Sequence, residues 1–111
     1  MPLHRIFHPT DAFSAAEKAT LSERITKLYT DVGLPAFYVV VLFIPIEKDS
    51  FFVGGQSTDK FIRIVVQHLA RQLPNDQRKA EFSKKYEETI APFIKDKGYD
   101  WEVCDMISLY F

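Results

Sequence analysis

Cysteine is nearly absent from this sequence, since Cys104 is the only one among 111 residues. A single cysteine excludes an intrachain disulfide, and a reducing compartment is the simplest interpretation. Excess charge is also absent, because 14 Lys and Arg stand against 15 Asp and Glu. A formal net charge of −1 therefore gives no reason to expect nucleic acid or an anionic membrane as a partner.

Long hydrophobic runs are missing as well. The longest, Phe37 to Ile44, is far too short to cross a bilayer. The first residues, Met1 to Arg5, lack the basic-then-apolar pattern of a signal peptide. We therefore expect a cytoplasmic protein without a membrane partner. What the sequence does have is 47% hydrophobic residues and ten Phe, which is typical of one globular domain over residues 1–111.

Two helices are predicted from apolar spacing and end signals. The first begins at a capping box, Ser14 to Glu17, and stops at Gly33 and Pro35. Its apolar positions are Leu21, Ile25, Leu28, Tyr29 and Val32. The second follows a break at 73–76 and has Phe82, Tyr86, Ile90, Phe93 and Ile94 at helical spacing. Pro92 predicts a kink or an early end there, and Gly98 a stop.

Strands are predicted where β-branched and aromatic residues gather. They cover residues 3–8, 37–44, 51–53, 61–69 and 101–110. Pro45 is expected to end the second strand. Gly54 and Gly55 are expected to form a hairpin turn after the third. The order is strand, helix, strand, twice over, in residues 2–44 and 61–109. Strands joined through a crossover helix pair parallel. We expect an α/β (α+β) fold in which two β-α-β units form a four-stranded sheet with two helices on one face.

The strand over Val39 to Ile44 is apolar at every position. Such strands are normally buried on both faces, and two helices on one face cover only half of that surface. Either another subunit covers the open face, which predicts a homo-oligomer, or long loops fold over it.

Pro2 is the first candidate for chemistry. Methionine aminopeptidase generally removes Met before proline, which would leave a secondary amine at the terminus. Burial and nearby cations lower the pKa of such an amine, so that it acts as a general base at neutral pH. The alternative is an ordinary Met-Pro start, and a retained Met1 would make the Pro2 nitrogen an amide.

Arginines and histidines are the other candidates. Arg63 and Arg71 lie on or beside the strand over 61–69, where an arginine either holds a carboxylate through two hydrogen bonds or is a solvated surface residue. His4 shares strand parity with Pro2 and either lines the same pocket or is a plain strand residue. The three histidines, His4, His8 and His68, lack metal-ligand spacing, so we expect no metal.

Four features together resemble the tautomerase superfamily, and within it the fungal branch related to cis-3-chloroacrylic acid dehalogenase. They are Pro2 opening the first strand, the doubled strand-helix-strand plan, the segment Phe52 to Gly55, and the segment Phe61 to Arg71. The resemblance covers roughly Pro2 to Trp101. It implies a trimer, and cofactor-free chemistry on small keto or unsaturated carboxylic acids.

The resemblance also assigns roles. Pro2 matches the proline that moves a proton between carbon and oxygen, and Arg71 matches the first arginine that grips the substrate carboxylate. Tyr29 stands where the dehalogenase has a histidine. Its second arginine falls near Pro74 and its last-strand tyrosine near Val103.

The glutamate of the dehalogenase's tail has no counterpart before Phe111. Dehalogenase or hydratase activity is therefore not expected, whereas keto–enol tautomerisation needs fewer groups.

Three hypotheses follow. The first is a tautomerase or isomerase with Pro2 as base, Arg71 as carboxylate grip, and Tyr29, His4 and Arg63 in the pocket. The second is an inactive tautomerase-fold protein that serves assembly or binding. The third is an unrelated ferredoxin-like binding module that happens to begin Met-Pro.

Overall fold

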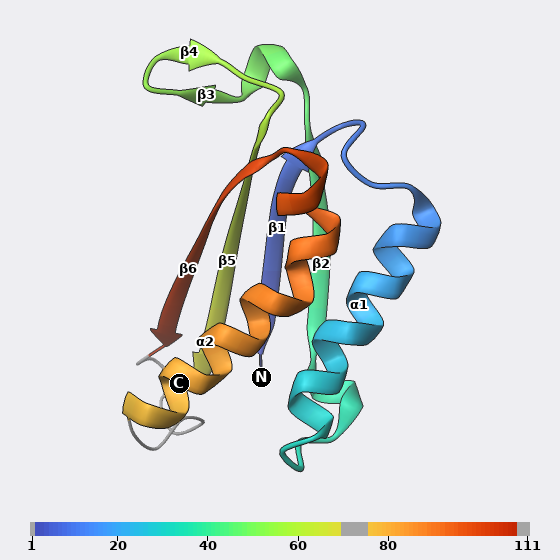
Figure 1. Cartoon of the computed structure of the whole chain (residues 1–111), viewed down its shortest axis with the longest axis vertical. Helices are drawn as coiled ribbons and strands as arrows, with labels where there is room; N and C mark the ends of the chain where they lie inside the picture. Colours follow the sequence, from blue (N-terminus) through green and yellow to red (C-terminus); the bar gives the residue numbers. More distant parts are fainter. Residues whose placement is uncertain (1, 70–75, 109–111) are drawn as a thin grey trace.

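The computed structural model describes residues 2–69 and 76–108 and contains one main sheet, two helices and a small hairpin (Figure 1). The strands are β1 (Leu3–Pro9), β2 (Val40–Ile46), β3 (Phe52–Val53), β4 (Gln56–Ser57), β5 (Phe61–Leu69) and β6 (Asp100–Ser108). The helices are α1 (Ala15–Thr30) and α2 (Asp76–Ile90), with short 3₁₀ turns η1 (Ala36–Tyr38), η2 (Lys48–Ser50), η3 (Ala91–Phe93) and η4 (Lys95–Lys97).

The main sheet has the strand order β2-β1-β5-β6. Strand β1 pairs parallel with β2 and β5 pairs parallel with β6, while β1 and β5 are antiparallel at the centre. Both helices lie on the same face of this sheet (Figure 1). The predicted fold of two β-α-β units with two helices on one face is confirmed.

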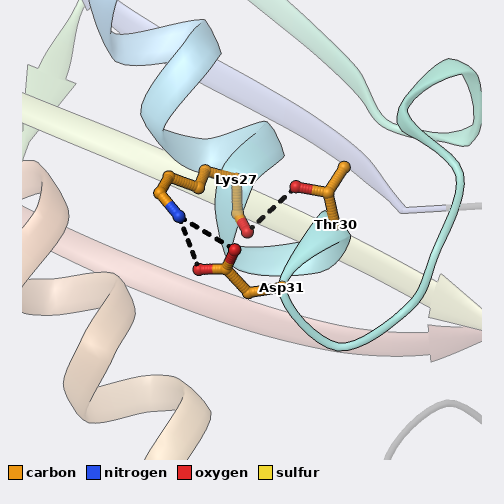
Figure 2. Close-up of polar contacts among 3 residues, drawn as sticks. All are labelled: Lys27, Thr30 and Asp31. Carbon is orange, nitrogen blue, oxygen red and sulfur yellow. Dashed lines mark hydrogen bonds and ion pairs between the residues drawn. The ribbon is translucent and has the colours of Figure 1, made fainter.

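The ends of α1 are fixed by local contacts. The Ser14 hydroxyl accepts a hydrogen bond of 3.1 Å from the Glu17 backbone, and the Ser14 backbone donates one of 2.9 Å to the Glu17 carboxylate. At the other end, Lys27 donates to both carboxylate oxygens of Asp31 at 2.9 and 3.0 Å, and the Thr30 hydroxyl donates to the Lys27 carbonyl at 3.3 Å (Figure 2). The predicted capping box is confirmed.

The other predicted turns are also present. Helix α2 ends at Ile90, and Pro92 lies in the 3₁₀ turn that follows. Gly54 and Gly55 both have positive φ, 60° and 81°, which is what a two-residue hairpin turn between β3 and β4 requires.

The prediction for the second strand was wrong at both ends. Residues 36–38 form η1, in which the Tyr38 backbone donates to the Pro35 carbonyl at 3.1 Å, so β2 begins only at Val40. Pro45 does not close the strand, which continues to Ile46. An edge strand tolerates proline at a position whose N–H would face the side without a partner strand, because no hydrogen bond of the sheet is lost there.

Burial alternates along the strands. On the face under the helices, the core contains Ile6, Leu21, Ile25, Ile62, Ile64, Val66, Tyr86, Ile90 and Ile94, all at most 4% exposed. We call the opposite face of the sheet the open face. It carries Val40, Leu42 and Ile44 of β2, and Leu42 is 44% exposed. In a single chain, therefore, the apolar strand is covered on one face only.

Candidate active site

Pro2 lies directly before β1 and its side chain is fully buried. Its carbonyl oxygen accepts a hydrogen bond of 2.9 Å from the Val40 backbone, at the end of the β1–β2 pairing where Leu3 is paired with Val40. Because Pro2 has the same strand parity as His4 and Ile6, which are both 0% exposed, its ring lies on the face under the helices.

His4 is the next residue on that face, and both of its ring nitrogens are hydrogen-bonded. Nε2 lies 2.9 Å from the Tyr29 hydroxyl, and Nδ1 lies 2.9 Å from the Tyr86 hydroxyl. Tyr29 comes from the last turn of α1 and Tyr86 from α2, so three elements meet at one imidazole. All three side chains are buried, at 0%, 6% and 4% exposure. The His4 side chain therefore links β1 to both helices.

Aromatic contacts hold these groups in place. The His4 ring is nearly parallel to the Tyr86 ring, at 9° with centroids 5.4 Å apart, and meets Tyr29 edge-on at 5.5 Å. Phe82, one turn before Tyr86, packs edge-on against Tyr29 at 5.1 Å and Tyr86 at 6.1 Å. We call His4, Tyr29 and Tyr86 the tyrosine–histidine network.

The structure places neither predicted arginine in the tyrosine–histidine network: Arg63 lies elsewhere, and Arg71 is not among the described residues. Arg63 points to the open face and forms an ion pair of 3.2 Å with Glu102, both about half exposed. Within one chain the structure does not bring it together with Pro2. Arg71 lies outside the described residues. The strand before it, β5, ends at Leu69, and Gln67 of that strand is paired with Leu3.

His8 lies at the other end of β1, away from Pro2. Its Nδ1 donates a hydrogen bond of 2.7 Å to the Pro9 carbonyl, and its Nε2 has no partner among the described residues. Phe13 and Phe43 pack edge-on against the ring. Burial lowers the pKa of His8; the Pro9 hydrogen bond opposes this shift and the charge of Lys18 adds to it.

Sequence reasoning took Tyr86 for a core residue and missed its contact with His4. A signal was available, because a tyrosine on the buried face of a helix needs a hydrogen-bond partner for its hydroxyl. His4 and His8 share the parity of Pro2, so they were the two polar residues of β1 on the matching face of the sheet.

A separate groove of about 340 Å³ lies between α1 and α2. It is lined by Arg24, Lys27, Leu28, Asp31, Lys85, Glu88 and Thr89, and so contains no predicted site residue. Within residues 2–69 and 76–108, no three His, Cys, Asp or Glu side chains are grouped to hold a metal ion. In the same part of the chain, neither helix is long and apolar enough to cross a membrane.

Comparison with known proteins agrees with this architecture. Residues 1–106 match the family model Tautomerase_3, described as "Putative oxalocrotonate tautomerase enzyme". Native RhCC from Rhodococcus jostii RHA1 is 44% identical, with a TM-score of 0.91 over 96% of this chain and 76% of that one. A probable enzyme from the thermophilic fungus Aspergillus fumigatus is 34% identical, with a TM-score of 0.93 over 99% of this chain and 79% of that one.

A more distant structure shares the fold alone. N1, a member of the cis-3-chloroacrylic acid dehalogenase family, is 14% identical, with a TM-score of 0.75 over 95% of this chain and 75% of that one. A search of curated protein sequences finds no significant match. The resemblance to the tautomerase superfamily is confirmed.

Proposed function

The chain belongs to the Tautomerase_3 family, and from this membership we propose that it is a cofactor-independent tautomerase that acts on small keto, enol or unsaturated carboxylic acids. The observation that carries the proposal is the burial of Pro2 at the start of β1, beside a buried and fully hydrogen-bonded His4. A proline that is buried from solvent, next to polar groups held by hydrogen bonds, is suited to proton transfer to and from carbon.

Pro2 is the general base in this proposal. Excision of Met1 turns its nitrogen into a secondary amine, and burial disfavours the protonated form of that amine. The neutral nitrogen takes a proton from the carbon next to the substrate's carbonyl group and delivers it to the enolate oxygen, which gives the enol. The reverse transfer, from the enol oxygen to the carbon, gives the keto form. The hydrogen bond from Val40 to the Pro2 carbonyl supports this role, because it fixes the residue without using its nitrogen.

Arg71 is the residue that we propose binds the substrate carboxylate. It follows Leu69, the last residue of β5, by two positions in the sequence. Because Gln67 of β5 is paired with Leu3, the end of β5 and Pro2 lie at the same end of the sheet. A guanidinium there can hold a carboxylate through two hydrogen bonds and stabilise a developing enolate.

Tyr29 and His4 are the proposed polar groups of the pocket, with the Tyr29 hydroxyl donating to the substrate's carbonyl oxygen. Arg63 has no role within one subunit, because it is paired with Glu102 on the open face. We further propose that the protein is a cytoplasmic trimer, in which neighbouring subunits cover the open face.

A catalytically inactive tautomerase-fold protein is the alternative. It is favoured by Pro74, which stands where the related dehalogenase has its second arginine. In that case the fold serves assembly or binding, and the state of the Pro2 nitrogen has no consequence.

The experiment combines intact-mass measurement with a ketonisation assay on phenylenolpyruvate. We expect the purified protein to lack Met1 and to be active, and Pro2→Ala to lose about 100-fold or more in kcat/KM. Circular dichroism and thermal unfolding of both proteins control for folding. Equal rates for the two proteins, or a retained Met1 in an active protein, would contradict proline catalysis.

A further inference from the structure

The neutral ring of His8 carries its proton at a defined atom. A carbonyl oxygen only accepts hydrogen bonds, so the 2.7 Å contact between His8 Nδ1 and the Pro9 oxygen requires the ring proton on Nδ1. Nε2 of the neutral ring therefore carries a lone pair. This nitrogen is buried and has no hydrogen-bond partner among the residues that the structure describes. When the ring takes a second proton, that proton enters at Nε2.

The same Pro9 oxygen closes the turn between β1 and α1, residues 9–13, which we call the closing turn. It accepts a second hydrogen bond, of 3.0 Å, from the Ala12 backbone, so both of its lone pairs are used. Ala12 and Phe13 are 2% and 6% exposed, and the Phe13 ring packs edge-on against the His8 ring with centroids 5.0 Å apart. The closing turn therefore holds His8 away from water.

We propose that His8 is a pH-dependent switch on the closing turn: a proton bound at Nε2 opens residues 10–13, and its release closes them. The proton forms an N–H bond from the Nε2 lone pair and leaves one positive charge on the ring. A charged donor that is buried without an acceptor is costly, whereas water hydrates the same group in the open form. Because the open form binds the proton more tightly, acid shifts the population toward it.

The closing turn is the part of the cover over His8 that is able to open. Phe43 also packs edge-on against the ring, but it lies within β2, where it is paired with Ile6 of β1. Residues 10–13 lie outside every helix and strand. They are held by the hydrogen bond between Ala12 and Pro9 and by Lys97, whose Nζ donates to the Ala12 carbonyl at 2.9 Å.

The charged groups around the ring favour its neutral form. Burial lowers the pKa of His8, the hydrogen bond to Pro9 opposes this shift, and the charge of Lys18 in α1 adds to it. Lys97 of η4 lies on the other side of Phe13, 5.3 Å from the centre of that ring, and is paired with Glu17. In the closing turn itself Asp11 is exposed, and β2 packs only the uncharged Phe43 ring against His8.

The switch lies at the opposite end of β1 from the amino terminus (Figure 1), so it does not depend on the reaction proposed for Pro2. Its expected consequence is local. At acidic pH the closing turn opens and exposes Ala12 and Phe13, while the strands of the sheet remain paired.

Nitrogen NMR of the histidine-labelled protein and amide hydrogen exchange test the switch. At pH 7.5 we expect His8 to be neutral, with its proton on Nδ1. Protection factors correct for the intrinsic effect of pH on exchange. We expect that of the Ala12 amide to be about tenfold lower at pH 5.0 than at pH 7.5, because His8 in the open form titrates near 6.5.

Low concentrations of denaturant distinguish local opening from global unfolding. We expect Ala12 to be less protected than the amide of Ile6 at the centre of the sheet. We also expect exchange at Ala12 to be insensitive to denaturant, because a local opening exposes little surface, whereas exchange at Ile6 follows global unfolding.

His8→Asn retains an N–H donor for the Pro9 carbonyl and cannot take a second proton. We expect its Ala12 protection to differ less than about twofold between the two pH values. Lys97→Gln is the matched control, because it loosens the closing turn from the other side and keeps the imidazole. We expect it to lower Ala12 protection at both pH values and to retain the tenfold change between them.

Three results would overturn the proposal. The first is a wild-type His8 with its proton on Nε2 at pH 7.5, and the second is a wild-type Ala12 protection factor that does not change with pH. Both are measured without a variant. The third is exchange at Ala12 that follows global unfolding in denaturant, or a pH dependence that persists in a folded His8→Asn protein.

Discussion

The carbonyl oxygen of Pro2 lies 2.9 Å from the backbone nitrogen of Val40 and accepts its hydrogen bond. This contact anchors the first residue of the proposed site to the neighbouring parallel strand through an atom that the chemistry does not use. The nitrogen of Pro2 can therefore change its chemical state, from amide to amine, while the residue keeps its place beside His4. The first prediction follows from this separation.

Inserting a lysine between Met1 and Pro2 blocks excision of the methionine and leaves the Pro2 nitrogen an amide. We expect the fold to persist, because the Val40 hydrogen bond and the strand register remain, and ketonisation to fall by about 100-fold or more. Intact mass, circular dichroism and the phenylenolpyruvate assay provide the measurement. A blocked protein with wild-type rates would show that the amine is not the base.

Tyr29→Phe removes the hydroxyl that contacts His4 and keeps the ring that packs against Phe82. We expect kcat to fall about tenfold or more, because the proposed donor to the substrate's oxygen is lost. Tyr38→Phe is the matched control at the same end of the sheet, since Tyr38 is 38% exposed and we expect it to change kcat less than about twofold. Equal losses in the two variants would argue against a role for Tyr29.

His8 makes stability depend on pH. Its pKa in the folded protein is below 6.5 because of burial, whereas in the unfolded chain it titrates near 6.5. Between these two values the unfolded state binds a proton that the folded state does not. The free energy of unfolding therefore falls as pH drops below 6.5, by at most about 1.4 kcal/mol per pH unit from this group.

Denaturant unfolding at pH 7.5 and 5.5 measures this dependence. His8→Asn keeps an N–H donor for the Pro9 carbonyl and cannot titrate, so we expect a smaller loss of stability between the two pH values than in the wild type. An identical pH dependence in both proteins would assign the titration to another group.

Ser14→Ala removes the hydroxyl of the capping box at the start of α1. We expect the free energy of unfolding to fall by about 1 kcal/mol, the usual contribution of such a cap. Ser83→Ala, at an exposed position inside α2, is the control and should change stability by less than about 0.5 kcal/mol. Similar losses in both variants would mean that the cap contributes little.

Local signals made the helix ends, the glycine hairpin and the doubled β-α-β order predictable, because each depends on residues close in sequence. The continuation of β2 through Pro45 was missed, since it depends on the strand lying at a sheet edge, which neighbouring residues do not encode. The network around His4 was missed for a similar reason: its partners lie 25 and 82 residues away. Parity along β1 indicated that His4 shares a face with Pro2, but only the packing of α1 and α2 identifies what it contacts.

Leu42→Arg tests whether another subunit covers the open face. Leu42 is 44% exposed in β2, and burying that exposed part in an interface would contribute about 1 kcal/mol per subunit. An arginine there would place a charge in the interface, so we expect light scattering to show three chain masses for the wild type and one for the variant. Val32→Arg adds the same charge at a residue that is 74% exposed beyond α1 and should remain assembled. A monomeric wild-type protein would contradict the packing reasoning, because the apolar face of β2 would then be stable in water.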